Sequence, residues 1–179
     1  MLPFITRPIR FCALACASLL ASCSLFAPPP PPAPLRPQVA ADADMLGAIR
    51  AAGDRETSII AVNPLRDPGV AALHDAALQD ERRGQYADAA AKLDQALKLS
   101  PESPDLLQDR AEAAVLTKDF AAAERLAYQS WSLGPRLGPL CARNWQTVVE
   151  MRLQAGDANG AATARKWVQR CHKAGIPRY

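Results

Sequence analysis

The chain has 179 residues, with 21 lysine and arginine residues against 18 aspartate and glutamate residues and a formal net charge of +3. It contains no dense run of basic residues interleaved with aromatic residues, so the composition does not favour a nucleic-acid-binding protein. Once the terminal segments are set aside, the length allows one domain of ordinary size.

Residues 1–22 have the features of an export signal. Arg7 and Arg10 form a basic head, and the apolar run over residues 11–20 is too short to span a bilayer. The sequence Leu20-Ala21-Ser22-Cys23 resembles the lipobox of bacterial lipoproteins, which implies cleavage before an acylated Cys23. The alternative is an ordinary secretory signal with a chance cysteine. In the lipoprotein sorting pattern, the absence of aspartate after Cys23 points to the outer membrane, facing the periplasm.

Residues 23–42 form the predicted linker between this anchor and the folded domain. Prolines dominate residues 28–37, and such a run favours polyproline II over helix or strand. Ten residues in that conformation reach roughly 30 Å. We interpret the run as a semi-rigid spacer, and the alternative is a ligand for a proline-binding domain. Without residues 1–22 the chain retains 19 basic residues against 18 acidic ones, so the mature protein is nearly neutral.

Residues 43–66 are predicted to form an N-terminal extension. Residues 44–52 favour a short helix, whereas the apolar, β-branched run at residues 58–62 favours an extended segment lying against the helical domain. The alternative for that run is a strand that pairs with a partner.

A 34-residue period dominates residues 67–176, the predicted folded domain. Small residues, an aromatic residue and a proline recur in register: Ala77, Tyr86, Ala89, Ala96, Leu99 and Pro101 return as Ala111, Phe120, Ala123, Ser130, Leu133 and Pro135. This period is the length of one helix–turn–helix unit. A third unit fits when four extra residues are allowed, with Trp145, Ala161 and Val168 at packing positions.

Helix limits follow from local signals. Asp67-Pro68 starts a helix that runs to about residue 83, Gly84-Gln85 forms the turn, and a partner helix covers residues 86–99. Ser103 and Asp119 are predicted to cap the next two helices, the second of which covers residues 120–133 and ends at Gly134-Pro135. Gly156-Asp157 marks the turn of the third unit.

These units resemble the tetratricopeptide repeat family over about residues 69–174. The resemblance implies an all-α fold of three stacked helical hairpins, a short α-solenoid, whose concave surface binds protein partners. The chain departs from the family pattern at Leu73 and Leu107, where tryptophan is frequent, and at Ala158, which replaces the aromatic residue.

Two cysteines, Cys141 and Cys171, remain after the signal and the anchor are set aside. In the third hairpin they lie near ends that an antiparallel helix pair brings together, and the exported compartment is oxidising, so we predict a disulfide. A redox pair is disfavoured by the spacing, and a metal site with His172 lacks a fourth ligand. We therefore predict no metal and no cofactor.

In a tetratricopeptide array, the first helix of each hairpin lines the groove. The resemblance implies a partner-binding groove of mixed charge, lined by His74, Leu78, Glu81, Arg82, Gln108, Glu112, Val115, Arg143, Gln146 and Glu150. The alternative is that these are ordinary solvent-facing positions. The three tryptophans are interpreted as packing residues rather than anchors for a partner.

The chain carries no recognisable catalytic constellation. Its two histidines are about a hundred residues apart, and no glycine-rich phosphate loop or His-x-x-x-His spacing occurs. We predict a non-enzymatic, lipid-anchored scaffold that binds protein partners during pilus or envelope assembly or in the recruitment of cell-wall enzymes. The alternatives are a structural, self-associating envelope protein without a specific peptide ligand, and an enzyme that acts on wall fragments.

Overall fold

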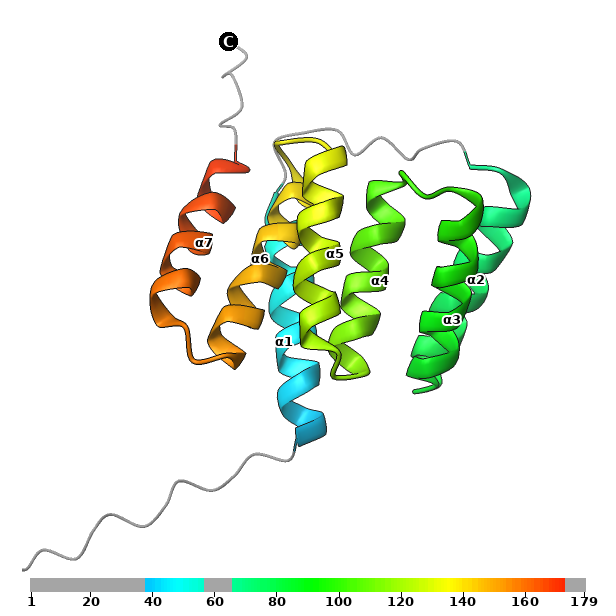
Figure 1. Ribbon diagram of the computed structural model, residues 1–179, viewed down its shortest axis with the longest axis horizontal. Coiled ribbons are helices and arrows are strands. Elements are labelled where there is room, and N and C mark those ends of the chain that lie inside the picture. Colours follow the sequence, from blue (N-terminus) through cyan, green and yellow to red (C-terminus); the bar gives the residue numbers. More distant parts are fainter. Residues whose placement is uncertain (1–37, 57–65, 173–179) are drawn as a thin grey trace, which may run out of the picture. The chain divides into compact units, whose positions relative to one another are not determined.

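The computed structural model describes residues 38–56 and 66–172, which belong to one compact unit, Arg36–Tyr179. The described residues form seven helices and no strand (Figure 1). The predicted signal peptide, the lipidation site Cys23, the proline-rich spacer and the apolar run at residues 58–62 lie outside the described residues. The helices are α1 (Gln38–Asp54), α2 (Pro68–Arg82), α3 (Tyr86–Leu99), α4 (Pro104–Leu116), α5 (Phe120–Leu133), α6 (Pro139–Gln154) and α7 (Ala158–Arg170).

Helices α2 to α7 form three consecutive antiparallel hairpins. Within each hairpin the two helices pack along their length, and the hairpins join through contacts of α3 with α4 and of α5 with α6. The predicted all-α fold of stacked hairpins is confirmed. The four extra residues of the third unit are divided between two places, because the connection between α5 and α6 is one residue longer than that between α3 and α4, and α6 is three residues longer than α4.

The three hairpin turns repeat one backbone arrangement. Gly84, Lys118 and Gly156 each have a positive φ, of 76°, 64° and 74°. The next residue then donates its N–H to the carbonyl oxygen five residues earlier, at 2.8 to 2.9 Å in all three turns. Lys118 is the one non-glycine residue among them, and a side chain in the left-handed region costs about 1–2 kcal/mol. The packing of α4 against α5 must offset that cost.

Aspartate caps the start of one helix in every hairpin. Asp67 accepts a hydrogen bond from the backbone N–H of Gly69 at 2.8 Å, and Asp119 accepts one from Ala122 at 3.1 Å. Asp157 caps α7 in the same way. Ser103 precedes α4 as predicted but does not cap it, because its hydroxyl donates instead to the carboxylate of Asp105 at 2.7 Å.

Small residues allow the helices to approach closely. The repeat pattern pairs Ala77 with Ala111 and Ala89 with Ala123, and all four residues are buried. Ser130 stands where alanine is usual, and its hydroxyl donates to the carbonyl oxygen of Pro104 at 2.6 Å. The serine therefore ties α5 to the start of α4, and its burial leaves no unsatisfied hydroxyl.

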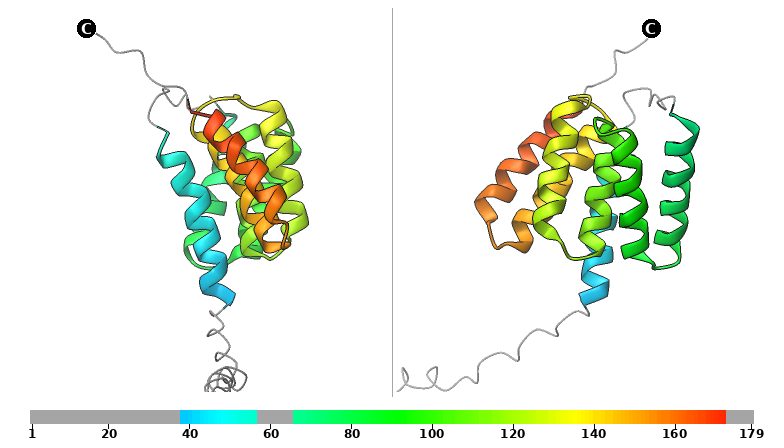
Figure 2. Two further views of the ribbon diagram at one scale, coloured as in Figure 1. Left: turned by 90° about the vertical axis from the view of Figure 1, so that its left-hand side faces the viewer. Right: turned by 45° about the vertical axis from the view of Figure 1, so that its right-hand side comes forward.

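Helix α1 is longer than predicted and packs on the repeats. It contacts α6 along much of its length and also touches α4. Figure 2 shows α1 on one side of the hairpins, away from α5 and α7. Ile49 and Ala52 of α1 are fully or almost fully buried in the same apolar cluster as α4, α5, α6 and α7. No helix within residues 38–56 and 66–172 is long and apolar enough to cross a membrane.

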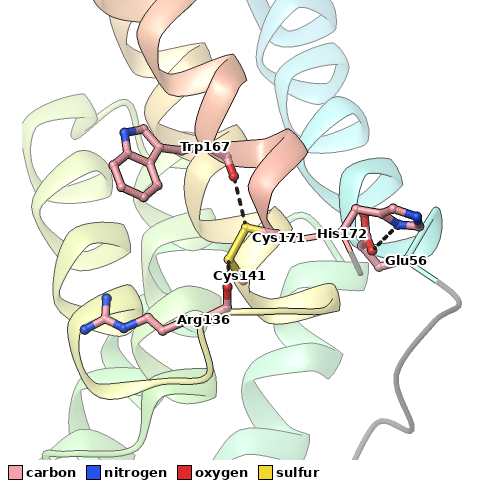
Figure 3. Close-up of a disulfide and its surroundings, with 6 residues drawn as sticks. All are labelled: Glu56, Arg136, Cys141, Trp167, Cys171 and His172. Atoms are coloured by element: carbon pink, nitrogen blue, oxygen red, sulfur yellow. Dashed lines mark hydrogen bonds and ion pairs between the residues drawn. A yellow bond between two sulfur atoms is a disulfide. The ribbon is translucent and has the colours of Figure 1, made fainter. Parts of the chain in front are cut away.

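A disulfide closes the third hairpin. Cys141 lies in the first turn of α6 and Cys171 directly follows α7, with their Cα atoms 5.6 Å apart (Figure 3). These are the two cysteines that the sequence analysis paired. Gly138, just before α6, also donates its N–H to the carbonyl oxygen of Cys171 at 2.8 Å. The end of α7 is therefore held to the start of α6 by a covalent bond and a hydrogen bond.

We predict that replacing both cysteines by serine lowers the free energy of unfolding by about 3–4 kcal/mol. The bond joins residues 30 positions apart, and in the chain-entropy model a loop of that length restricts the unfolded chain by about this amount. Denaturant unfolding of the oxidised chain and of the double variant measures the difference. The reduced wild-type chain is the control and should resemble the variant, and equal stability of all three samples would contradict the prediction.

Candidate functional site

The predicted groove faces α1. The first helices of the hairpins, α2, α4 and α6, form one side of the array, which we call the inner helix face, and α1 lies on its α4 and α6 portion. Val115 of α4 is fully buried there, in the same cluster as Ile49 and Ala52 of α1. A helix of the chain itself thus occupies most of the surface on which a partner was expected.

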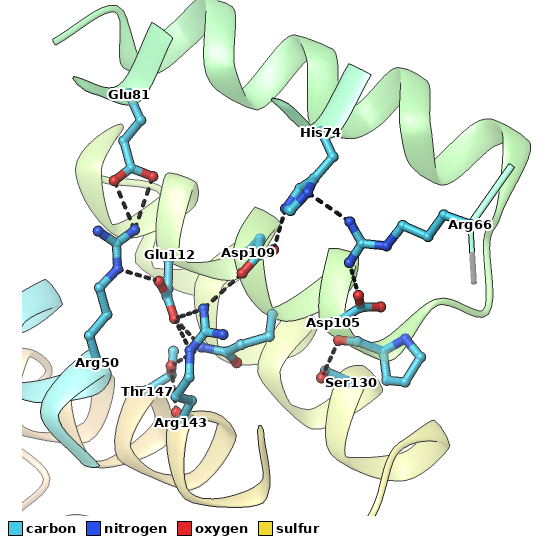
Figure 4. Close-up of polar contacts among 12 residues, drawn as sticks. Arg50, Arg66, His74, Glu81, Asp105, Asp109, Glu112, Ser130, Arg143 and Thr147 are labelled. Carbon is cyan, nitrogen blue, oxygen red and sulfur yellow. Dashed lines mark hydrogen bonds and ion pairs between the residues drawn. The ribbon is translucent and has the colours of Figure 1, made fainter. Parts of the chain in front are cut away.

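Arg50 of α1 joins two glutamates of the repeats. Its Nε donates to Glu112 of α4 at 2.9 Å, and its Nη2 donates to both carboxylate oxygens of Glu81 of α2 at 2.8 and 3.0 Å (Figure 4). The side chain of Glu112 is only 1% exposed, so its charge requires cationic partners. Arg50 therefore bridges the first two hairpins from outside them.

Arg143 of α6 meets the same carboxylate from the other side. Its Nε donates to Glu112 at 2.8 Å and its Nη2 donates to Asp109 at 2.7 Å, and Nη2 also forms an ion pair with Glu112 at 2.6 Å. Gln108, one turn before Glu112, donates to Glu112 at 3.0 Å and to the hydroxyl of Thr147 at 2.9 Å. Glu112 consequently accepts hydrogen bonds from α1, α4 and α6, and these bonds offset the cost of burying its charge.

The network continues from Asp109 to the first hairpin. His74 of α2 lies between Asp109 and Arg66, with ring nitrogens 2.7 Å from each (Figure 4). Because a guanidinium group only donates, Nδ1 must accept from Arg66, and the ring proton is assigned to Nε2, which donates to Asp109. Arg66 also pairs with Asp105 at the start of α4. Ion pairs and hydrogen bonds thus run without a gap from Glu81 to Asp105.

The electrostatics of the network stabilise the charged forms. Burial raises the pKa of Asp109, but the hydrogen bond from His74 and the charge of Arg143 outweigh it, so the pKa lies below its ordinary value. Burial works against the charges of Arg50 and Arg143, yet Glu112 and the other carboxylates prevail and hold the pKa of both guanidinium groups above its usual value. Opposite charges therefore hold one another in place.

The structure brings the predicted groove residues together but gives most of them internal partners. Gln108, Glu112 and Val115 are buried, contrary to their expected place on an open surface. Glu81, His74 and Arg143 are partly buried within the network described above. Gln146 and Glu150 are bonded to each other at 2.7 Å, Leu78 is half-buried, and Arg82 is exposed.

A cleft remains where α1 diverges from α2. It has a volume of about 270 Å³, and Leu46, Gly47, Arg50, Glu81, Tyr86 and Leu116 line it. Of the predicted groove residues, Glu81 alone lines this cleft, and its carboxylate is paired with Arg50. This cleft is thus small, and the one predicted groove residue that lines it is already charge-paired.

Sequence reasoning missed Arg50, Arg66, Asp105 and Asp109. From the sequence alone, Asp109 is interpreted like the other acidic residues of these helices, as a solvated residue on a helix surface. No sequence signal connects Arg50 with Glu112, which is 62 residues away. Among residues 38–56 and 66–172, no cluster of three histidine, cysteine or acidic side chains is arranged to hold a metal ion.

Comparison with known proteins agrees with this geometry. The tetratricopeptide repeat family matches residues 82–127 of the chain. The solved structure of the globular C-terminal domain of P. aeruginosa LpoP is 30% identical in sequence and superposes with a TM-score of 0.55. That match covers 59% of this chain and 99% of the LpoP domain. A search of curated proteins gave no match.

We predict that two glycines of α1 respond oppositely to alanine. A Cβ at Gly53 would lie 2.8 Å from Cγ of Arg143 and 3.3 Å from the carbonyl oxygen of Pro139, so Gly53→Ala displaces Arg143 from its carboxylates. A Cβ at Gly47 meets nothing within 4 Å, and Gly47→Ala should stabilise the helix by about 0.5–1 kcal/mol. We expect Gly53→Ala to destabilise the fold by about 1–3 kcal/mol. Denaturant unfolding measures both variants, and equal effects would disprove close docking of α1.

A second prediction concerns acid. Because the pKa of Asp109 is lower in the folded protein than in the unfolded chain, its contribution is fully present above the unfolded value of about 4 and is lost as the pH falls through the folded value. The stability advantage of wild type over Asp109→Asn should therefore narrow on acidification below about pH 4. Thermal unfolding of both proteins across this range tests it. If the difference in stability between wild type and Asp109→Asn stays constant or widens at low pH, the lowered pKa of Asp109 is contradicted.

Proposed function

We propose that this chain, which belongs to the tetratricopeptide repeat family, is an outer-membrane lipoprotein that faces the periplasm and binds protein partners. The family fold favours an interaction role, since stacked hairpins expose extended surfaces that bind other chains. We assign it no catalytic role. The two buried acids best placed for chemistry, Asp109 and Glu112, are each bound by arginine.

The observation that best supports this proposal is the docking of α1. The inner helix face holds a helix from outside the repeats by burying Ile49 and by enclosing Arg50 between two glutamates. This is the way in which a groove binds a helical segment of a partner. We propose that the groove positions named from the sequence serve chiefly to hold α1, and that partners bind the surfaces that α1 leaves free.

The anchoring part of the proposal is supported by the order of segments along the chain. The lipobox-like residues 20–23 come first, then the proline-rich spacer, and α1 begins at Gln38 directly after that spacer. A helix docked on α4 and α6 would transmit the position of a tether to the whole repeat array. The LpoP fragment similar to this chain is likewise described as a globular C-terminal domain.

Two envelope processes fit such a scaffold. Assembly of a structure such as a pilus requires a fixed platform at the membrane, and recruitment of cell-wall enzymes requires a domain held at a set distance from it. In both cases the protein contributes position and binding rather than chemistry. The alternative is a scaffold that associates only with itself. The two hypotheses are distinguished by whether the chain contacts other proteins or only further copies of itself in the envelope.

We predict that Cys23→Ser moves the protein from the membrane fraction to the soluble fraction, because the acylated thiol is lost. Cys16→Ser is the matched control and should remain in the outer membrane. Membrane retention of Cys23→Ser would disprove the anchor. Chemical cross-linking of the wild-type chain in intact envelopes should then yield a stoichiometric foreign protein. Cross-links to further copies of the chain alone would instead establish the self-associating alternative.

A further inference from the structure

The charges of the chain are unevenly distributed along the repeats. Sixteen of the 18 acidic residues precede residue 125. Residues 125–172, by contrast, contain seven arginine and lysine residues and only two acidic ones, Glu150 and Asp157. Asp157 is paired with Arg152, and Glu150 is bonded to Gln146. Two acidic residues from outside this range also lie here, and both have partners: Glu124 pairs with Arg152, and Glu56 contacts His172. Little unpaired negative charge is therefore left beside these cations.

Four of these cations lie exposed on α7 and on the connection that precedes α6. We call this set the basic face: Arg136, Arg165, Lys166 and Arg170. None of the four makes an ion pair within the described part of the chain, whereas arginines such as Arg50, Arg110 and Arg143 all do. These four cations are therefore available for electrostatic contacts with a partner molecule.

Two of the four cations, both arginines, are held against tryptophans. The guanidinium carbon of Arg136 lies 3.8 Å from the ring centroid of Trp131, and that of Arg170 lies 4.5 Å from that of Trp167. The two tryptophan rings touch, with centroids 5.9 Å apart, and both pack on Trp145. Arg136, Trp131, Trp167 and Arg170 form a continuous row from α5 to α7. Aromatic rings position a cation without neutralising it.

The disulfide anchors both ends of this row. Cys171 directly follows Arg170, Cys141 lies five residues after Arg136, and Figure 3 shows Arg136 and Trp167 on either side of the bond. The rings, the disulfide and the bond from Gly138 to Cys171 leave the row little freedom to rearrange. A surface held in its bound shape loses less entropy when a partner docks.

We infer that the basic face is a docking surface for an acidic segment of a partner protein. The inference rests on the proposed scaffold function and names its binding surface. Charge complementarity requires that the partner segment be negatively charged. Arginine and tryptophan are among the residues most enriched at the centres of protein interfaces. The exposed positions of α7 carry small or polar residues beside the cations, Ala162, Thr163 and Gln169 among them, and no large apolar side chain that would insert into a bilayer.

The test uses the full chain in nanodiscs of neutral phosphatidylcholine and a fluorescein-labelled oligoglutamate peptide as the probe. All three tryptophans of the chain belong to the cluster beneath the basic face, so intrinsic fluorescence reports binding there directly. We expect binding that weakens with added salt and a change in tryptophan emission. The variant Lys166→Glu/Arg170→Glu should bind roughly tenfold more weakly, since two attractive charges one turn apart on α7 become repulsive.

The matched control is Arg83→Glu/Lys98→Glu. It makes the same change in net charge at two exposed cations of the first hairpin, of which Arg83 approaches Asp80 only at 4.0 Å and Lys98 forms no ion pair in the described residues. This control should retain its affinity within about twofold. Equal weakening of both variants, or no binding of oligoglutamate, would overturn the docking surface. Changes in tryptophan emission on adding phosphatidylglycerol to the nanodiscs, without peptide, would assign the face to lipid instead. If cross-linked foreign partners persist when peptide binding fails, the scaffold function stands and only this surface is wrong.

Discussion

The buried carboxylate of Glu112 is the interaction on which the arrangement of the helices depends. It lies in α4, the middle of the inner helix face, and receives Arg50 from α1 and Arg143 from α6. An isolated charge at 1% exposure would be prohibitively costly, so the fold must bring cations to it. Because the buried carboxylate of Glu112 requires cationic partners, it holds α1, which belongs to no hairpin, in its position.

Docking of α1 changes what the inner helix face can bind. In an open array, this face would be a long groove of mixed charge available to a peptide. Here the same residues satisfy one another and α1, leaving a cleft of about 270 Å³ beside Glu81. Recognition is then shifted toward the other end of the array, where four exposed cations have no acidic partner among the described residues. The ion-pair network and the basic face are two results of one uneven charge distribution.

The third hairpin combines rigidity with exposure. It is the last hairpin of the described residues, and it carries the disulfide and two of the three tryptophans, Trp145 and Trp167, which pack against Trp131 of α5. A hairpin that packs on a neighbouring hairpin from one side only needs further stabilising contacts. Here a covalent bond and stacked rings supply that stabilisation and at the same time hold two arginines outward. The same contacts that stabilise the last hairpin therefore shape its surface.

The sequence by itself determined the elements that depend on local chemistry. Asp67 and Asp119 cap their helices, Gly84 and Gly156 allow left-handed turns, and recurrent alanines permit close crossings, so the helix limits and the stack of hairpins followed from neighbouring residues. Tertiary structure alone decided where α1 lies and which charges are buried. Arg50 and Glu112 are 62 residues apart, and Asp109 has the local surroundings of an exposed residue. Such pairings are set by long-range burial, which leaves no periodic signal in a single chain.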